Sequence, residues 1–282
     1  ELDLGDGLSL TAAYLGNTTL DAGRSDGLPK GDVRWYDNTD HMAYMHLHKQ
    51  ASDGILRDLS LRVGWHSLDE RVLRYTCTTE AACRALEPDG ITKRRRYHDT
   101  VNAGLLSFDT VLSAIDDRLD ITLGVDGRIE HVASDRRDAT ADSGWAYEAK
   151  DRGNFSEGSL YGGVDAFVYV EGRPYVDEGI VDLVLNAGAR VSHISAYAPD
   201  VPGLGDVDYQ WTGPVFTAGA RLILFNTVNI YANWAQGFRA PNLQEVTVLG
   251  DTGSLFEVPN GELSAERSDT VEAGLKLHHR WA

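Results

Sequence analysis

The chain has no long apolar segment. Among its 282 residues, the longest uninterrupted run of aliphatic and aromatic side chains is about Leu222–Phe225. A membrane-spanning helix needs roughly 20 such residues. The sequence therefore excludes a helical membrane protein. It leaves a membrane β-barrel open, because only every second residue of a barrel strand faces lipid.

Positive charge is also scarce. The chain has 26 Lys and Arg against 43 Asp and Glu, a formal net charge of −17. Binding nucleic-acid phosphates needs clustered cations, so we expect no nucleic-acid partner. One basic cluster, Lys93–Arg96, lies beside a predicted loop. It is either a solvated strand end or a contact for lipopolysaccharide phosphate or another anionic ligand.

Only two cysteines are present, Cys77 and Cys83, with five residues between them in the polar loop Thr76–Glu87. Zinc would need further ligands, and no histidine lies between His66 and His98. We predict a disulfide, which implies an oxidising compartment.

No signal peptide is visible, and Glu1–Leu4 resembles the interior of a longer sequence more than the start of a protein. Either a leader has been removed or the chain is a fragment, and we expect a fragment.

Period-2 alternation of apolar and polar residues recurs along the chain. It is clear at 119–126, 160–171, 181–192 and 271–278. This pattern predicts β-strands with one apolar and one polar face. The apolar rows carry no charge through their middles. A lipid-facing row requires this, because an Arg or Lys at mid-membrane costs about 2–4 kcal/mol.

The length of the runs separates a membrane barrel from a soluble sandwich. Runs near 98–114, 158–171, 180–195 and 264–281 are about 14–18 residues long, whereas ordinary strands have about 5–6. A strand tilted about 40° needs roughly 10–12 residues to cross the hydrocarbon and its edges. These runs are long enough to cross.

Two kinds of connection alternate along the chain. Short connections are predicted at 51–54, 115–118, 172–179 and 225–227. Long polar connections are predicted at 16–34, 68–97, 133–157, 196–209 and 240–263. Outer-membrane barrels have short periplasmic turns and long extracellular loops. The sequence therefore predicts an all-β, antiparallel transmembrane barrel wall of about ten strands.

Aromatic residues fit the same arrangement. Trp65, Tyr197 and Trp234 lie where apolar rows meet long loops, and Trp281 lies at the opposite level. Trp and Tyr favour both membrane–water interfaces. Each could also be a partly buried core aromatic.

Two segments are ambiguous. Within Val101–Leu112, apolar residues occupy both rows, and we predict a β-bulge there. Asp126-Gly127 could form a two-residue hairpin turn. Neither half alone would cross a membrane, so we predict one continuous strand.

The segment 229–276 resembles the late barrel strands of TonB-dependent outer-membrane receptors. One strand ends in Gln-Gly-Phe-Arg-Ala-Pro-Asn-Leu at 236–243, and Asn-Gly-Glu-Leu-Ser-Ala-Glu-Arg-Ser at 260–268 opens the next. The motif residues are Gln236, Gly237, Phe238, Arg239, Ala240, Pro241, Asn242, Glu245, Asn260, Leu263 and Glu266. The family usually has proline at the position of Ala265 and often at Gly261, so the return is less rigid here.

Other parts of the chain add to this resemblance. Leu183–Arg190 resembles a family strand that ends in Gly-x-Arg, and Trp35–Asn38 is weakly similar to haem-type members. The motif also has a physical interpretation, since Pro241 fixes its own φ and favours extended geometry at Ala240. Because adjacent strands place Arg239 and Glu266 near one loop, we predict that they form an ion pair.

The resemblance implies a function. Residues 1–282 would form part of a barrel of about 22 strands in the outer membrane of a Gram-negative bacterium, with the plug domain absent from this chain. Such receptors take up scarce large ligands such as a ferric siderophore, haem or cobalamin. The TonB complex supplies energy through the plug, and the membrane partners are outer-membrane lipid and lipopolysaccharide. The expected protein is a transporter and not an enzyme.

The polar rows supply the candidates for facing a ligand or plug. They are Tyr44, His46, His48, Arg62, His66, Asp165, Tyr169, Asp182 and Arg190. His46 and His48 share a face, with His66 on the next strand, which would suit a metal or haem. Paired strand histidines are more often solvent-facing, so we predict no metal site and no cofactor.

Two other classes of protein compete with the receptor. A small outer-membrane β-barrel enzyme would need convergent Asp, His or Ser at one rim. The nearest candidates are Asp40-His41 and His98-Asp99, but sequence neighbours on a strand point to opposite faces. A soluble all-β binding protein would point the same apolar rows inward.

Overall fold

The computed structural model describes residues 2–51, 54–115, 118–150, 153–177, 179–252 and 255–277. One antiparallel sheet contains twelve strands, paired in the order β1-β2-β3-β4-β5-β6-β8-β9-β10-β11-β14, with β7 also on β6. Most neighbours in the sheet are consecutive in the chain, so the main connections are hairpins; the exceptions are β6-β8, with β7 between them in sequence, and β11-β14, with the β12-β13 hairpin between them. Among the described residues, no helix is long and apolar enough to span a membrane.

The strands of this sheet are β1 (Leu2–Gly5), β2 (Leu8–Arg24), β3 (Asp32–Gln50), β4 (Leu56–Cys77), β5 (Ile91–Ala114), β6 (Leu119–Thr140), β7 (Glu148–Ala149), β8 (Ser159–Asp177), β9 (Val181–Val201), β10 (Gly205–Leu224), β11 (Val228–Arg239) and β14 (Glu266–Leu277). The remaining elements are the helices η1 (Leu28–Lys30), α1 (Glu80–Ala85), η2 (Pro88–Gly90) and α2 (Leu243–Thr247) and the hairpin of β12 (Gly250–Thr252) and β13 (Leu255–Glu257).

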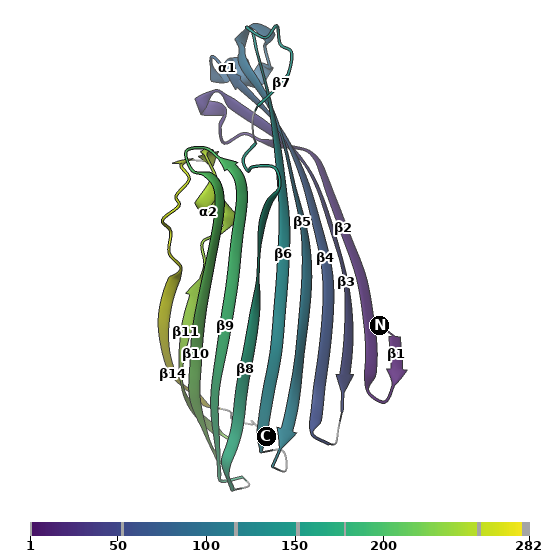
Figure 1. Ribbon diagram of the computed structural model, residues 1–282, viewed down its shortest axis with the longest axis vertical. Coiled ribbons are helices and arrows are strands. Elements are labelled where there is room, and N and C mark those ends of the chain that lie inside the picture. The colour runs from purple at the N-terminus through teal and green to yellow at the C-terminus, as the bar shows by residue number, and fades with distance from the viewer. Residues whose placement is uncertain are drawn as a thin grey trace.

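The long strands stand side by side as a curved wall that is not closed, with β1 and β14 at its edges (Figure 1). Ten described strands have 12 residues or more, which agrees with the predicted number. All the helices lie at one end of the wall, which we call the loop end. The short connections at the other end define the turn end.

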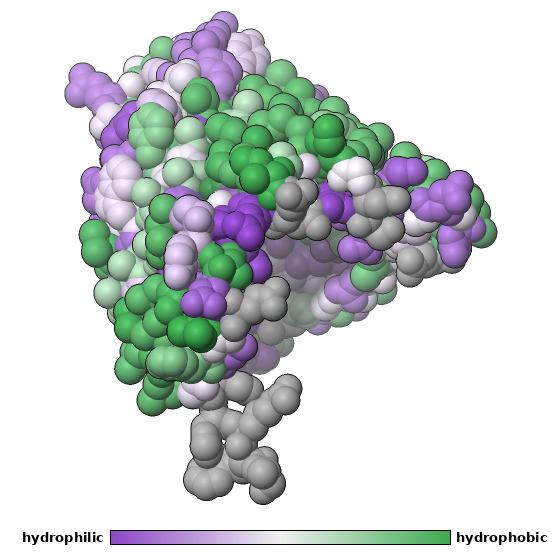
Figure 2. All heavy atoms as spheres, turned by 90° about the horizontal axis from the view of Figure 1, so that it is seen from below, coloured by the Kyte–Doolittle hydropathy of each residue, from purple (hydrophilic) through white to green (hydrophobic). Residues whose placement is uncertain are grey.

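Side chains alternate strictly between two faces. One row across the sheet reads Leu61, Phe108, Val125, Ala166 and Val191, and the next reads Arg62, Ser107, Asp126, Asp165 and Ser192. Figure 2 shows apolar side chains over the outside of the wall and hydrophilic ones around the hollow. Large apolar residues such as Val63 and Val125 are exposed on the outward face. Most of the wall therefore has no conventional core, and its outside carries a band of exposed apolar side chains of the kind that marks an interaction surface.

The strands run further toward the loop end than predicted. The long connection predicted at 196–209 is wrong, because β9 and β10 continue to a turn of only three residues at 202–204. The connections predicted at 16–34, 68–97 and 133–157 shrink to 25–31, 78–90 and 141–158. Above the apolar band both faces of a strand meet water. The alternation that marks a strand then disappears from the sequence although the hydrogen-bond ladder continues.

The β-bulge predicted within Val101–Leu112 is absent from the part where apolar residues occupy both rows, since Val101–Val111 of β5 pairs without a register shift with both β4 and β6. The one register shift at this segment is in β4, between Leu56 and Asp58, opposite Leu112 and Val111. Leu105 is apolar on the inward row, and its side chain lies over Gly64 of the neighbouring strand. The missing side chain at Gly64 provides the space that a bulge would otherwise have to create.

Other predictions about the connections are confirmed. β6 passes through Asp126 and Gly127 without a turn. The short connections at 115–118 and 225–227 are present. The connection predicted at 172–179 is shorter, since β8 continues to Asp177 after a register shift between Gly172 and Tyr175.

The aromatic residues lie near the upper limit of the apolar band. Trp65 and Tyr197 are both exposed on outward rows. Trp234 lies on the outward row of β11, and its indole N–H donates to Asp269 Oδ1 over 3.2 Å. Trp281 lies outside the described residues.

A small apolar cluster supports the loop end on the β3–β5 side. It contains Leu28, Val33, Ile91 and both cysteines. The structure joins Cys77 and Cys83 in a disulfide with a Cα–Cα distance of 5.5 Å. Helix α1 starts at the N-cap Thr79, whose side chain accepts from the Ala82 N–H over 3.1 Å. The disulfide therefore ties this helix to the end of β4.

Neighbouring residues on β6 can test the two faces. In the full-length gene product inserted in phospholipid vesicles, Val125→Arg is expected to destabilise the folded protein by about 2–4 kcal/mol, because it places a charge in hydrocarbon. The matched control Asp126→Arg lies on the polar face beside Asp165 and is expected to cost far less. Denaturant titration measures both. Equal losses would contradict the assignment of the faces.

Candidate functional site

The nine polar-row candidates lie on one face of the sheet, as the alternation predicts. These residues are Tyr44, His46, His48, Arg62, His66, Asp165, Tyr169, Asp182 and Arg190. Ion pairs join this face from strand to strand. Arg62 contacts Asp109 over 2.8 Å, and Arg190 lies 3.8 Å from Asp165.

The inward face encloses a cavity of about 640 Å³. Its lining extends from Tyr44 on β3, through Arg62, Asp165 and Arg190, to Arg239 on β11. Residues from strands far apart in the sheet border one space because the wall curves around it. Seven lining residues were chosen from sequence: the candidates Tyr44, Arg62, Asp165 and Arg190 and the motif residues Phe238, Arg239 and Ala240.

The three histidines have separate polar partners, although the His46 and His48 rings stack with their centroids 5.5 Å apart. His46 contacts Ser60 Oγ over 2.9 Å, and His48 contacts Asp58 over 2.7 Å. His66 contacts Asp40 over 2.7 Å. Among the described residues, no group of three or more His, Cys, Asp or Glu could hold a metal ion. Each histidine thus has its own neighbour in the polar network of the inward face.

The inward face of the loop end is strongly basic. Five cations from four strands surround two buried carboxylates there. The cations are Arg34, Arg74, Lys93, Arg95 and Arg136, and the carboxylates are Asp32 and Asp138. We call this group the inner basic cluster. Its formal charge is +3, whereas the whole chain carries −17.

Each carboxylate serves more than one cation. Asp32 accepts from Arg34 over 2.9 Å and from Arg74 over 2.5 Å. Asp138 accepts from Lys93 and from Arg136, each over 2.7 Å. Burial opposes the ionisation of Asp138, but the hydrogen bonds from Arg136 and Lys93 outweigh it and lower its pKa to about 2. The cluster therefore keeps its pairing well below neutral pH.

The basic segment Lys93–Arg96 divides between the two faces because it is part of β5. Lys93 and Arg95 join the inner basic cluster. Arg94 and Arg96 lie on the outward side, over the rings of Trp145 (4.8 Å) and Tyr147 (4.0 Å). The prediction of one basic cluster at Lys93–Arg96 beside a loop did not include this division between two faces. The period-2 rule, applied to a longer β5, would have shown it.

Two neighbouring carboxyl groups lie on the same face toward the membrane. Glu70 and Asp99 are directly opposite each other on β4 and β5. Burial and the nearby Asp99 raise the pKa of Glu70. Burial also raises the pKa of Asp99, although Ser134 and Asn154 donate hydrogen bonds to it. As the pH falls, Glu70 and Asp99 therefore become protonated at a higher pH than ordinary carboxylates do.

The family-motif residues begin and end the loop between β11 and β14. Arg239 bridges two carboxylates, Glu245 over 2.5 Å and Glu266 over 3.1 Å. The predicted Arg239–Glu266 pair is therefore present. Asn242 and Glu245 form a capping box at the start of α2. The spacing Asn-x-x-Glu could have predicted this helix from sequence.

The same loop folds onto the inward face. Leu243 and Val246 of α2 pack in an apolar cluster with Tyr161, Ala196 and Val207. The Trp211 indole N–H donates to the Leu263 carbonyl over 3.2 Å. The loop thus covers the β8–β10 part of the mouth, opposite the inner basic cluster on β3–β6.

The remaining motif residues have local contacts. Gln236 donates to Asp269 over 3.2 Å, and Asn260 accepts from the Glu262 N–H over 2.9 Å. Gly213 of β10 leaves room for the Phe238 ring, since an added Cβ would lie 2.2 Å from it. Gly237 similarly adjoins Ser268, and Ala240 is buried.

The candidate enzyme pairs separate as expected. Asp40 contacts His66, whereas its neighbour His41 contacts the Tyr14 hydroxyl over 2.6 Å. His98 contacts Asp69 over 2.6 Å on the outward face, and Asp99 contacts Ser134 on the inward face.

Solved structures of similar fold are two receptors and a transporter by their titles. The copper transporter OprC has a TM-score of 0.66 at 13% identity, over 89% of this chain and 38% of OprC. The Serratia marcescens hemophore receptor HasR, a double mutant with its hemophore HasA and heme, has a TM-score of 0.63 at 13% identity, over 97% of this chain and 40% of HasR.

A third structure is the ferric-catecholate import receptor Fiu of E. coli, with a TM-score of 0.53 at 14% identity, over 97% of this chain and 47% of Fiu. At these identities the likeness shows the fold alone. The chain spans less than half the length of each of these proteins. No curated protein matches the chain in sequence.

A family model supplies the sequence-level evidence. The model described as TonB dependent receptor-like, beta-barrel matches residues 2–282. The sheet of long antiparallel strands agrees with that match, and so does the motif around the β11–β14 loop. The chain therefore belongs to the TonB-dependent receptor-like β-barrel family.

Proposed function

We propose that this chain forms part of the barrel wall and mouth of an outer-membrane receptor in a Gram-negative bacterium. The receptor takes up an anionic ligand too large for porins. A ferric siderophore or haem fits this charge best, and cobalamin fits it less well. The protein acts as a transporter and not as an enzyme.

The inner basic cluster is the observation that carries this proposal. Five cations face the hollow with only two carboxylates among them, both already shared between cations. An anionic chelate would complete the charge balance. Arg guanidinium groups suit this task because they bind carboxylate and catecholate-type oxygens through two parallel hydrogen bonds.

The rest of the transport machinery follows from the family. Open sheet edges are not stable in hydrocarbon, so β1 and β14 would pair with further strands of a larger barrel. A plug domain, absent from residues 1–282, would fill that barrel and receive energy from the TonB complex. Lipid and lipopolysaccharide would surround the apolar band.

The DNA that flanks this reading frame tests the proposal first. We expect it to encode a plug domain and further strands in the same frame. A frame that starts and stops with this chain would contradict uptake by this product. Detergent-free solubility of a monodisperse chain would instead favour the soluble all-β alternative.

Ligand binding tests the inner basic cluster directly. In the full-length gene product, Arg95→Glu is expected to weaken binding of a ferric catecholate about tenfold or more, because it replaces a charge-assisted hydrogen bond by repulsion. Arg96→Glu, on the other side of the same strand, is the matched control and should leave the affinity unchanged. Intrinsic-fluorescence titration measures both. Similar affinities for the two variants would count against the cluster.

The pH dependence of binding tests the neighbouring carboxyl pair. Because their pKa values are raised, Glu70 and Asp99 lose their charge first as pH falls, while Asp138 stays ionised with a pKa of about 2. The inward face then becomes more positive, so affinity for an anionic ligand should rise. Asp99→Asn should reduce this rise in affinity. The comparison with wild type removes any effect of the ligand's own titration, because that titration is the same for both proteins. An unchanged pH profile in the variant would remove the role of Asp99.

The contacts of Arg239 predict how the β11–β14 loop is held. Arg239→Ala should speed hydrogen exchange at the amides of α2, and Arg267→Ala, on the facing strand, is the control. The Arg239 hydrogen bond lowers the pKa of Glu245 below its ordinary 4.5, so the contact forms above that value and is lost only as pH falls through the lowered pKa. Protection of α2 should therefore persist at pH 4.5. Equal exchange in both variants would show that the ion pairs do not hold the loop.

A further inference from the structure

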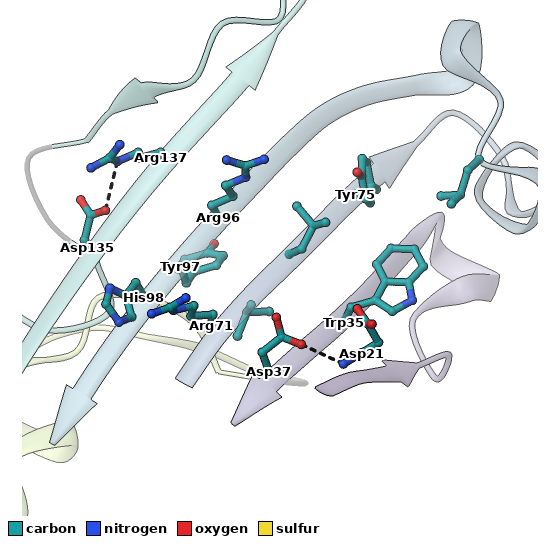
Figure 3. Close-up of a pocket in the computed structure, with 13 residues that line it drawn as sticks. Asp21, Trp35, Asp37, Arg71, Tyr75, Arg96, Tyr97, His98, Asp135 and Arg137 are labelled. Carbon is teal, nitrogen blue, oxygen red and sulfur yellow. Dashed lines mark hydrogen bonds and ion pairs between the residues drawn. The ribbon is translucent and has the colours of Figure 1, made fainter. Parts of the chain in front are cut away.

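The outward face of the loop end carries a second polar site, on the opposite side of the sheet from the inner basic cluster. A groove of about 640 Å³ lies across β2–β6 there. Figure 3 shows its lining side chains along neighbouring strands, with arginines on β4, β5 and β6 and the Trp35 ring on β3. We call it the outer groove. Nothing in the proposed transport step uses it.

We propose that the outer groove binds a phosphate-bearing sugar of an outer-leaflet glycolipid. This inference rests on the proposed function, since it needs the apolar band to lie in an outer membrane. Three features of the groove favour such a ligand: its height above the band, its exposed guanidinium groups and its aromatic wall.

The height of the groove selects the kind of lipid. On the outward row of β4, Trp65 ends the apolar band and Arg71 follows six residues later. At about 3.3 Å per residue and a tilt of about 40°, Arg71 lies roughly 15 Å above Trp65. Phospholipid headgroups add only about 5–8 Å to each side of the hydrocarbon. The groove therefore lies above phospholipid phosphates, at a level that only the sugars of a glycolipid would reach.

Exposed arginines provide the phosphate contact. Arg71, Arg96 and Arg137 are all exposed on adjacent strands, with Arg96 directly opposite Arg137. Arg71 lies 3.2 Å from Asp69, and Arg137 lies 3.2 Å from Asp135. Within the described part of the chain, Arg96 has no carboxylate at ion-pair distance and only stacks on Tyr147. Arg96 is thus the guanidinium most available to a phosphate.

The carboxylates of the groove indicate a sugar rather than a simple anion. Asp21, Asp37 and Asp135 line it together with the three arginines, and His98 is paired with Asp69. The Asp37 carboxylate accepts from the Asp21 N–H over 2.8 Å and keeps further lone pairs free. Because the positive and negative charges of the groove are nearly balanced, inorganic phosphate alone would bind only weakly. Sugar hydroxyls can donate to these carboxylates while a phosphate on the ring meets Arg96.

Aromatic rings supply the apolar surface that a sugar ring needs. Trp35 and Tyr75 lie edge to face with their ring centroids 5.5 Å apart. Both pack against the disulfide-linked cluster at the loop end, so their positions are fixed. Leu86, after α1, closes this end of the groove. A pyranose ring could pack against this wall with its polar edge toward the arginines.

Adjacent residues on β5 give a matched experiment. The full-length gene product would be reconstituted in phosphatidylcholine nanodiscs that contain a purified lipopolysaccharide of short core, and native mass spectrometry would count the glycolipid retained. Arg96→Glu is expected to reduce retention about tenfold or more. Arg95→Glu, which faces the hollow, should retain as much as wild type. Arg96→Gln serves as a second variant in case charge reversal prevents folding.

A separate experiment distinguishes a phosphate carried by the glycolipid from free inorganic phosphate. Enzymatically dephosphorylated lipopolysaccharide should be retained poorly by wild type, and millimolar inorganic phosphate should not displace the intact glycolipid. Displacement by phosphate would show an anion site without sugar recognition. Equal retention by wild type and both Arg96 variants would overturn the proposal.

The same variants separate this proposal from the transport function. If Arg95→Glu leaves catecholate binding intact while Arg96→Glu loses glycolipid, the outer groove stands and the inner basic cluster fails as the ligand site. If Arg95→Glu loses catecholate and Arg96→Glu keeps glycolipid, the reverse holds.

Discussion

The structure depends on one constraint, which is that backbone N–H and C=O groups in hydrocarbon must all be hydrogen-bonded within the protein. The chain meets it with hairpins whose registers continue for most of the length of each strand, as between β3 and β4, which pair without a shift from Asp32 to Gln50. An uninterrupted register also maintains strict alternation of side chains. The separation into an apolar outside and a polar hollow is therefore a consequence of backbone hydrogen bonding.

Above the membrane the same alternation has a different result. The strands of the β2–β6 half continue into water, where neither face has to be apolar. Each face can then carry its own charges, and β5 places Lys93 and Arg95 on one side and Arg94 and Arg96 on the other. One short basic segment thereby contributes to two sites separated by the thickness of a single sheet. A soluble sandwich could not use both faces in this way, because one of them would be buried.

The sequence predicted the membrane part of the fold better than the loop end. Within the band, lipid imposes a period that reveals each strand, and the continuous path through Asp126 and Gly127 followed from it. Above the band that period is lost, so the turn at 202–204 was mistaken for a long loop. The inward position of Asp165 and Arg190 needed only the period. The inner basic cluster could not be predicted, because it joins Asp32 to Arg74 across 42 positions through the register of β3 and β4.

The family motif is explained by where pairing stops. β10 and β11 pair only as far as Thr217 and Ala235, whereas β11 and β14 pair up to Arg239 and Glu266. The end of β11 is therefore held on one side alone. This frees it to leave β10, with the Phe238 ring in the space left by Gly213, and to carry the chain across the inward face into α2. Arg239 is the last residue paired with β14 and also the residue that binds Glu245 of the loop. The Arg239 side chain thus links the last residue pair of β11 and β14 to the loop that covers the inward face.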